Sequence, residues 1–168
     1  EGGAGEEARI PRVVGWASRT FDLPVIAHRC MRYGIPWPWY YCETRGKNPR
    51  FRFSFERQLD LMDVLSGFQV RGRASLADMA LLLGLPGKLG FSGAQVWDAV
   101  LGGQLAAVRD YCEIDVLNTY LVLLRFELFR GRLDQAAYQH ELERLRELLR
   151  NSTAAHHQQF LRAWEPGV

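Results

Sequence analysis

The chain has 168 residues, which is enough for one domain with a sizeable core. Its residues are 48% hydrophobic and 24% charged, which excludes a disordered or fibrous protein, and the net charge of +2 indicates no particular partner. No apolar run is long enough to span a bilayer, and the first residues contain no secretory signal. The three cysteines are widely and irregularly spaced, so we expect neither a disulfide framework nor a metal or redox motif. These features predict a cytoplasmic protein.

The first third of the chain predicts a strand followed by a helix. Residues 1–11 are rich in glycine and glutamate and predict a flexible lead-in. Residues 12–16 form a short apolar run typical of a β-strand. A helix is then expected from about residue 21 to Gly34, with Ser18 or Thr20 as its N-cap.

The next segment alternates prolines with aromatic residues and then becomes basic. Phe51, Phe53 and Phe55 alternate with polar residues, as in an exposed strand. Residues 59–65 predict a second buried strand, although the same pattern would also serve a helix.

From residue 75 onward the pattern is helical. One helix is expected to begin after Ser75 as its cap, and a long one to occupy residues 104–130. A short helix is expected at residues 92–97, and an amphipathic helix capped by Asp134 follows. The residues after Asn151 are polar and are expected to form a frayed tail.

Tyr111 and Asp115 lie four residues apart in the long helix and therefore share one face. A tyrosine buried with its hydroxyl satisfied is the common case. An aspartate among apolar residues needs a donor, a cation or a metal, because an unpaired buried carboxylate is costly.

Asp22 follows Phe21 at a helix start. It is either a first-turn carboxylate favoured by the helix dipole or a metal ligand, and in the second case Phe21 would stack against a base.

Together, these carboxylates suggest phosphodiester hydrolysis with two divalent cations, Mg²⁺ or Mn²⁺, which prefer oxygen ligands. One ion would generate the hydroxide, the other would stabilise the leaving oxygen, and Tyr111 would orient the attacking water. On this hypothesis, Asp22 and Asp115 bind metal.

Aromatic and basic residues between positions 37 and 57 suit a single-stranded nucleic acid, since rings stack on bases and cations follow phosphates. The same residues are equally typical of a loop that aromatic rings hold in place, with its arginines exposed to solvent.

Gly84-Leu85-Pro86-Gly87-Lys88 fails the phosphate-loop pattern, so a connecting turn is the simpler interpretation, although Lys88 could contact a phosphate. None of the four histidines shows metal-ligand spacing with acidic residues. The basic residues considered as contacts are Arg45, Lys47, Arg50, Arg52 and Lys88.

Four motifs in this order resemble the predicted 3′–5′ exonucleases related to the proofreading domain of family-B DNA polymerases. The resemblance covers roughly residues 12–150. The motifs are Phe21-Asp22-Leu23-Pro24, Leu59-Asp60-Leu61-Met62-Asp63, Gly84-Leu85-Pro86-Gly87-Lys88 and Tyr111-Cys112-Glu113-Ile114-Asp115-Val116-Leu117-Asn118-Thr119-Tyr120.

The resemblance implies an α/β, ribonuclease-H-like fold of the DEDD exonuclease superfamily, tyrosine subtype, with a helix-rich C-terminal half. Asp22 matches the second exonuclease motif, and Tyr111 and Asp115 match the third. Asp60 falls in a further motif whose role does not follow from the sequence. We expect one exonuclease domain over residues 12–150, preceded by the lead-in and followed by a polar tail at residues 151–168.

The chain departs from the family pattern at several points. Ala17 and Ser18 replace an asparagine and a glycine, and Gln58 replaces a histidine. The Asp-x-Glu of the first motif is absent, because residues 1–11 offer only isolated glutamates. Without the opening strands, the strand at residues 12–16 would expose edges, so we expect either a missing N-terminal segment or a partner subunit to cover it.

Two functions therefore remain open. The first is a metal-dependent 3′–5′ exonuclease acting on the 3′ end of DNA, preferably single-stranded, with RNA as an alternative substrate. The second is a catalytically inactive nucleic-acid-binding or interaction module derived from such a nuclease.

Overall fold

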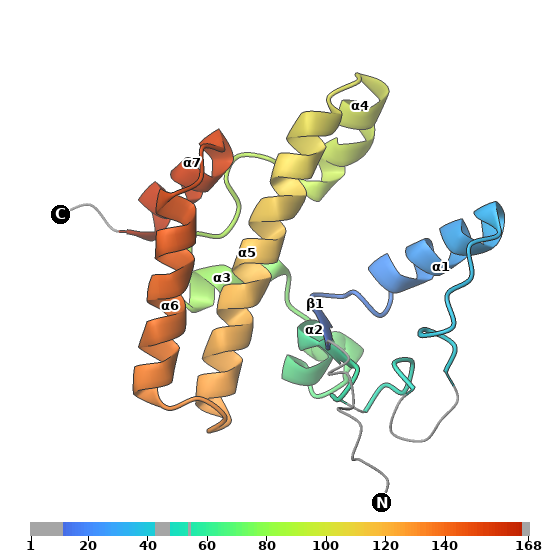
Figure 1. Cartoon of the computed structure of the whole chain (residues 1–168), viewed down its shortest axis with the longest axis horizontal. Coiled ribbons are helices and arrows are strands. Elements are labelled where there is room, and N and C mark those ends of the chain that lie inside the picture. Colours follow the sequence, from blue (N-terminus) through green and yellow to red (C-terminus); the bar gives the residue numbers. More distant parts are fainter. Residues whose placement is uncertain (1–11, 43–47, 54, 166–168) are drawn as a thin grey trace, which may run out of the picture. The chain divides into compact units, whose positions relative to one another are not determined.

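A computed structural model describes residues 12–42, 48–53 and 55–165 (Figure 1). The chain divides into two compact units, with the boundary after Phe68. Among the described residues, the first unit contains a small sheet and the second is helical. The structure is thus mostly helical with one two-stranded parallel sheet, so the α/β expectation is confirmed only in part.

The sheet of the first unit joins segments that are far apart in the sequence. Strand β1 (Val13–Gly15) pairs in parallel with β2 (Gln58–Asp60), and Val14 lies opposite Leu59. All three residues of β2 are buried, whereas those of β1 are half-buried. The segment 59–65, for which the sequence allowed a strand or a helix, divides into the end of β2 and helix α2 (Leu61–Leu65).

Helix α1 (Asp22–Tyr33) follows β1 and ends at Gly34, as predicted. Gly34 adopts a left-handed φ of 64°, which favours glycine, and its N–H bonds to the carbonyl of Met31. The predicted cap at Ser18 or Thr20 is wrong. Phe21 occupies the N-cap position without a side-chain cap bond, while the Thr20 hydroxyl donates to the carbonyl of Ala17 and the Ser18 hydroxyl accepts from the Gln58 amide.

The predicted exposed strand around Phe51 and Phe53 is also wrong for the described residues, which form turns. The two phenylalanine side chains are exposed and contact each other edge to face. Arg52, which lies between them, bonds to the buried carboxylate of Asp63. The sequence pattern does not reveal this long-range bond.

The second unit begins with a short 3₁₀ turn and continues through helices (Figure 1). The cap at Ser75 is confirmed, since its hydroxyl accepts from the backbone N–H of Asp78 while the Asp78 carboxylate accepts from Ser75. Asp134 likewise caps the helix that follows it. The helical elements are η1 (Val70–Gly72), α3 (Leu76–Leu82), η2 (Gly93–Gln95), α4 (Val96–Leu101), α5 (Leu105–Phe129), α6 (Gln135–Arg150) and α7 (Ala155–Trp164).

Helices α5, α6 and α7 enclose the main hydrophobic core. Residues 155–164, expected within a polar, frayed tail, instead form α7, because Phe160 and Leu161 supply an apolar face to this core. The Gln158 amide donates to the carbonyl of Leu149 and so ties α7 to the end of α6. The other buried members of the core are Ile114, Leu121, Leu124, Tyr138, Leu142, Leu145 and Leu149. Among the residues that the structure describes, no helix combines the length and hydropathy needed to cross a bilayer.

Candidate functional site

Tyr111 and Asp115 lie together on α5, each half-buried. The Tyr111 hydroxyl donates a hydrogen bond to the Asp115 carboxylate. Burial, followed by the hydrogen bond to Asp115, raises the pKa of Tyr111 to about 12, so the phenol is protonated at neutral pH. The predicted juxtaposition on one helix face is present in the structure.

Neighbouring groups offset only part of the cost of burying the Asp115 carboxylate. Burial raises its pKa above the ordinary value, although the hydrogen bond from Tyr111 and the positive charge of Lys88 oppose the shift. A cation at this oxygen would offset the desolvation that burial imposes. The carboxylate oxygens of Asp115 are suitable donors for Mg²⁺ or Mn²⁺, so the chemistry of this residue fits such an ion.

Lys88 reaches this pair from the glycine-rich loop between α3 and η2. Its Nζ lies 6.0 Å from the centroid of the Tyr111 ring, and the Phe91 ring packs against the same tyrosine at 5.2 Å. The side chain of Lys88 is exposed. The loop therefore places a solvent-accessible cation beside Tyr111 and Asp115, where it can attract a phosphate.

Asn118 fixes this loop on α5, and sequence reasoning missed it as a positioning residue. Its side chain accepts from the N–H of Gly87 at 3.0 Å and donates to the Gly87 carbonyl at 2.9 Å. It also donates to the carbonyl of Ile114 and is almost completely buried. The signal in the sequence is its spacing, because Asn118 follows Tyr111 by seven residues and Asp115 by three, on the same helix face.

Asp22 and Phe21 lie at the start of α1, in the first unit, whereas Tyr111 and Asp115 belong to the second. The Phe21 side chain is 67% exposed, and Asp22 is also exposed, in the first helical turn. Both residues are therefore open to solvent in their own unit.

The turn that leads into α1 is organised by Asp60, whose role the sequence left undefined. Its carboxylate accepts from the backbone N–H groups of Ala17 at 3.1 Å and Arg19 at 2.9 Å, and from that of Asp63 at 3.3 Å. Gly15 is required for the tight approach, since a Cβ there would meet the Ser18 Cβ at 2.5 Å. Asp60 thus supports the segment that presents Asp22.

Replacing Asp60 by asparagine is expected to destabilise the first unit by about 1–3 kcal/mol, because an amide NH₂ would replace one acceptor oxygen facing buried donors. The amides of Ala17 and Arg19 should exchange with deuterium faster in the variant. The exposed Asp98 gives a matched Asp→Asn control that should leave these amides unchanged. Unchanged exchange in the Asp60 variant would exclude this supporting role.

The residues considered as nucleic-acid contacts differ in their surroundings. The guanidinium of Arg50 lies 4.9 Å from the centroid of the exposed Tyr41 ring. Arg52 bonds instead to Asp63, with distances of 3.2 Å and 2.9 Å. Arg45 and Lys47 lie outside the described residues.

The aromatic residues nearby are partly core. Tyr40 is buried with Leu23 and Ala27 of α1, and Trp37 stacks on Tyr40 with centroids 4.6 Å apart. These rings pack the segment after α1 against the helix. The adjacent Tyr41 ring, in contrast, is exposed to solvent.

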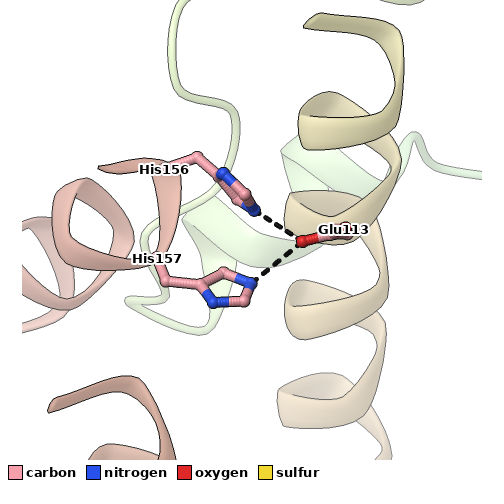
Figure 2. A group of neighbouring side chains, drawn as sticks. All are labelled: Glu113, His156 and His157. Atoms are coloured by element: carbon pink, nitrogen blue, oxygen red, sulfur yellow. Dashed lines mark hydrogen bonds and ion pairs between the residues drawn. The ribbon is translucent and has the colours of Figure 1, made fainter. Parts of the chain in front are cut away.

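A second cluster joins α5 to α7 and was not expected from the sequence. The sequence spacing of the four histidines indicates no metal site, but in the folded chain the rings of His156 and His157 both face Glu113 (Figure 2). Helix α7 folds back onto α5 and so brings His156 into contact with Glu113, 43 positions earlier in the sequence.

Comparisons with curated proteins and with solved structures found no match. A family model does match, over residues 4–164, and its description is "Predicted 3'-5' exonuclease related to the exonuclease domain of PolB". The matched range includes Asp22, Asp60, Lys88, Tyr111 and Asp115. The chain belongs to this family of predicted 3′–5′ exonucleases.

Proposed function

We propose that the protein is a metal-dependent 3′–5′ exonuclease that removes nucleotides from the 3′ end of DNA, with a preference for single strands. The family implies a ribonuclease-H-like exonuclease fold and a nucleic-acid substrate. The observation that carries the proposal is the hydrogen-bonded Tyr111–Asp115 pair on α5, with the Lys88 cation beside it.

In this proposal Asp22 and Asp115 would supply carboxylate ligands for two divalent cations, Mg²⁺ or Mn²⁺. Such ions lower the pKa of bound water and stabilise charge on the scissile phosphate. Tyr111 remains a neutral phenol at working pH because its pKa is about 12, and its hydroxyl orients the attacking water. Lys88 attracts the phosphate, and Asn118 keeps the Lys88 loop in place.

Nucleic-acid binding is assigned to the exposed side chains of Phe21 and Arg50 and to Lys88. Phe21 offers a ring face next to Asp22, where a terminal base could stack. Arg50 together with Tyr41 offers a cation and a ring. Arg45 and Lys47 remain predicted contacts, whereas Arg52 is given a mainly structural role because its guanidinium is bound to Asp63.

Replacing Arg50 by alanine is expected to weaken single-strand binding. The negative slope of log affinity against log salt should become shallower by about 0.7, the value for one phosphate contact. Fluorescence anisotropy with a labelled oligonucleotide at several salt concentrations measures both quantities. The matched Arg52→Ala variant should keep the slope and lose stability instead, because the buried Asp63 loses its bidentate partner. An unchanged slope for Arg50→Ala would indicate that the loop around Arg50 has only a structural role and does not contact the nucleic acid.

A second function is favoured by one specific observation: the sequence contains no Asp-x-Glu. The carboxylates expected to complete a two-metal site are therefore missing from this sequence. On this alternative, the chain is an inactive nucleic-acid-binding or interaction module that retains Tyr111 and Asp115 from a nuclease.

The two functions are separated by incubating the chain with 3′-labelled single-stranded DNA and Mn²⁺ or Mg²⁺. The exonuclease proposal predicts release of labelled mononucleotide that stops when EDTA is added. Binding without release would overturn the exonuclease proposal and support the module. A parallel reaction with RNA of the same sequence tests the preference for DNA.

A further inference from the structure

Two histidines at the start of α7 converge on one carboxylate of α5 (Figure 2). Nε2 of His156 lies 2.6 Å from Oε2 of Glu113, and Nε2 of His157 lies 3.2 Å from the same oxygen. One candidate ligand atom from each of the three residues lies within 4.8 Å of the others. Three donor atoms thus converge closely enough for a single ion to be shared among them.

The remaining ring nitrogens have oxygen partners of their own. Nδ1 of His157 lies 2.8 Å from the Ser152 hydroxyl, and Nδ1 of His156 lies 3.5 Å from Oδ1 of Asp110. When Nδ1–H donates to these oxygens, each Nε2 keeps its lone pair. Histidines that bind metals are commonly oriented in this way by an oxygen at the second ring nitrogen.

From this geometry we propose that Glu113, His156 and His157 form a binding site for a divalent cation of the Zn²⁺ class. Two imidazoles and one carboxylate are a known ligand set for Zn²⁺, and three protein ligands leave a position for water. Imidazole nitrogens favour Zn²⁺ and its transition-metal neighbours over Mg²⁺, which prefers oxygen. Without a metal, protons on the two imidazole rings mediate their contact with Oε2 of Glu113. The bound cation would take the place of these protons.

The site is distinct from the proposed exonuclease site. Glu113 is two residues from Tyr111 and two from Asp115, and each step of two turns a helix by about 200°. Glu113 therefore projects from the side of α5 opposite to the Tyr111–Asp115 pair. The proposal does not rest on nuclease activity.

The ligands are held on ordered elements yet remain reachable from solvent. Phe160 is fully buried in the core and anchors α7, while Arg109 pairs with the other Glu113 oxygen at 3.5 Å. The side chains of His156, His157 and Glu113 are 12%, 19% and 40% exposed. A bound ion would fasten the start of α7 to α5 and so stabilise the end of the second unit.

The test is a calorimetric titration of the metal-free whole chain with ZnCl₂ in the presence of excess Mg²⁺. We expect a single Zn²⁺ site that Mg²⁺ does not occupy, and a rise in Tm when Zn²⁺ is present. In NMR spectra, Zn²⁺ should shift the ring signals of His156 and His157 but not those of His28 or His140.

Removing a hydrogen-bond partner of a metal ligand typically lowers metal affinity by ~10- to 100-fold, and Ser152→Ala should lower the Zn²⁺ affinity within that range. The double variant His156→Gln with His157→Gln removes two ligands and should lower the Zn²⁺ affinity by more than that range. Glu113→Gln, at a partly exposed position, gives a second ligand variant if the histidine variant fails to fold, with circular dichroism as the check. His140→Gln and Cys112→Ser are matched controls and should bind normally. Absent binding in the unsubstituted chain, or full binding in either ligand variant, would overturn the proposal.

Discussion

An Asp115→Asn variant is expected to release nucleotides from a DNA 3′ end at least ~10³-fold more slowly than the unsubstituted chain. Asparagine preserves the size of the side chain but removes the charge that would hold a divalent cation. A bound ion contributes several kcal/mol to transition-state stabilisation, which corresponds to a loss of this size. The measurement is the initial rate of mononucleotide release at saturating Mn²⁺.

Asp98→Asn provides the matched control, because Asp98 is an exposed aspartate of the same unit and should retain the full rate. A second readout is independent of turnover: paramagnetic Mn²⁺ should broaden the NMR signals of Tyr111 in the unsubstituted chain but not in the Asp115 variant. Equal rates and equal broadening in both proteins would remove Asp115 from the metal site.

Replacing Phe160 by alanine is expected to lower the free energy of unfolding by about 3–5 kcal/mol, the usual cost of deleting a buried aromatic side chain. Phe160 is fully buried among side chains of α5, α6 and α7. Urea denaturation followed by circular dichroism, which reports mainly on the helices, measures the change.

The matched control is Phe129→Ala, since Phe129 ends α5 with its side chain 83% exposed. That variant should change stability by no more than about 0.5 kcal/mol. If both variants unfolded at the same urea concentration as the unsubstituted chain, α7 would not belong to the core. The expectation of a frayed tail would then be correct.

Local signals in the sequence predict much of the helical structure. Ser75 and Asp134 are caps whose hydrogen bonds reach only three residues along the chain, so their effect is visible in the sequence. Gly34 stops α1 for an equally local reason, its left-handed backbone. The expectation of a strand around Arg52 failed, and there the structure shows turns and a bond from Arg52 to the distant Asp63, which no local pattern indicates.

The same distinction applies to the candidate site. The Tyr111–Asp115 pair follows from helix periodicity, because four residues form about one turn. Asn118 acts on Gly87, which lies 31 positions away, and the Glu113 cluster depends on α7 folding back over 43 positions. Helix periodicity places Asn118 on the face of Tyr111 and Asp115, but no local pattern encodes its partner Gly87 or the contact between α7 and Glu113.

The most direct test of the proposed exonuclease uses 5′-labelled single-stranded DNA with Mn²⁺, digested side by side by the unsubstituted chain and by Asp115→Asn. We predict a ladder that shortens one nucleotide at a time from the 3′ end with the unsubstituted chain, and intact DNA with the variant. Internal cleavage, intact DNA in both reactions, or the same ladder from the variant would contradict a 3′–5′ exonuclease site at Tyr111 and Asp115.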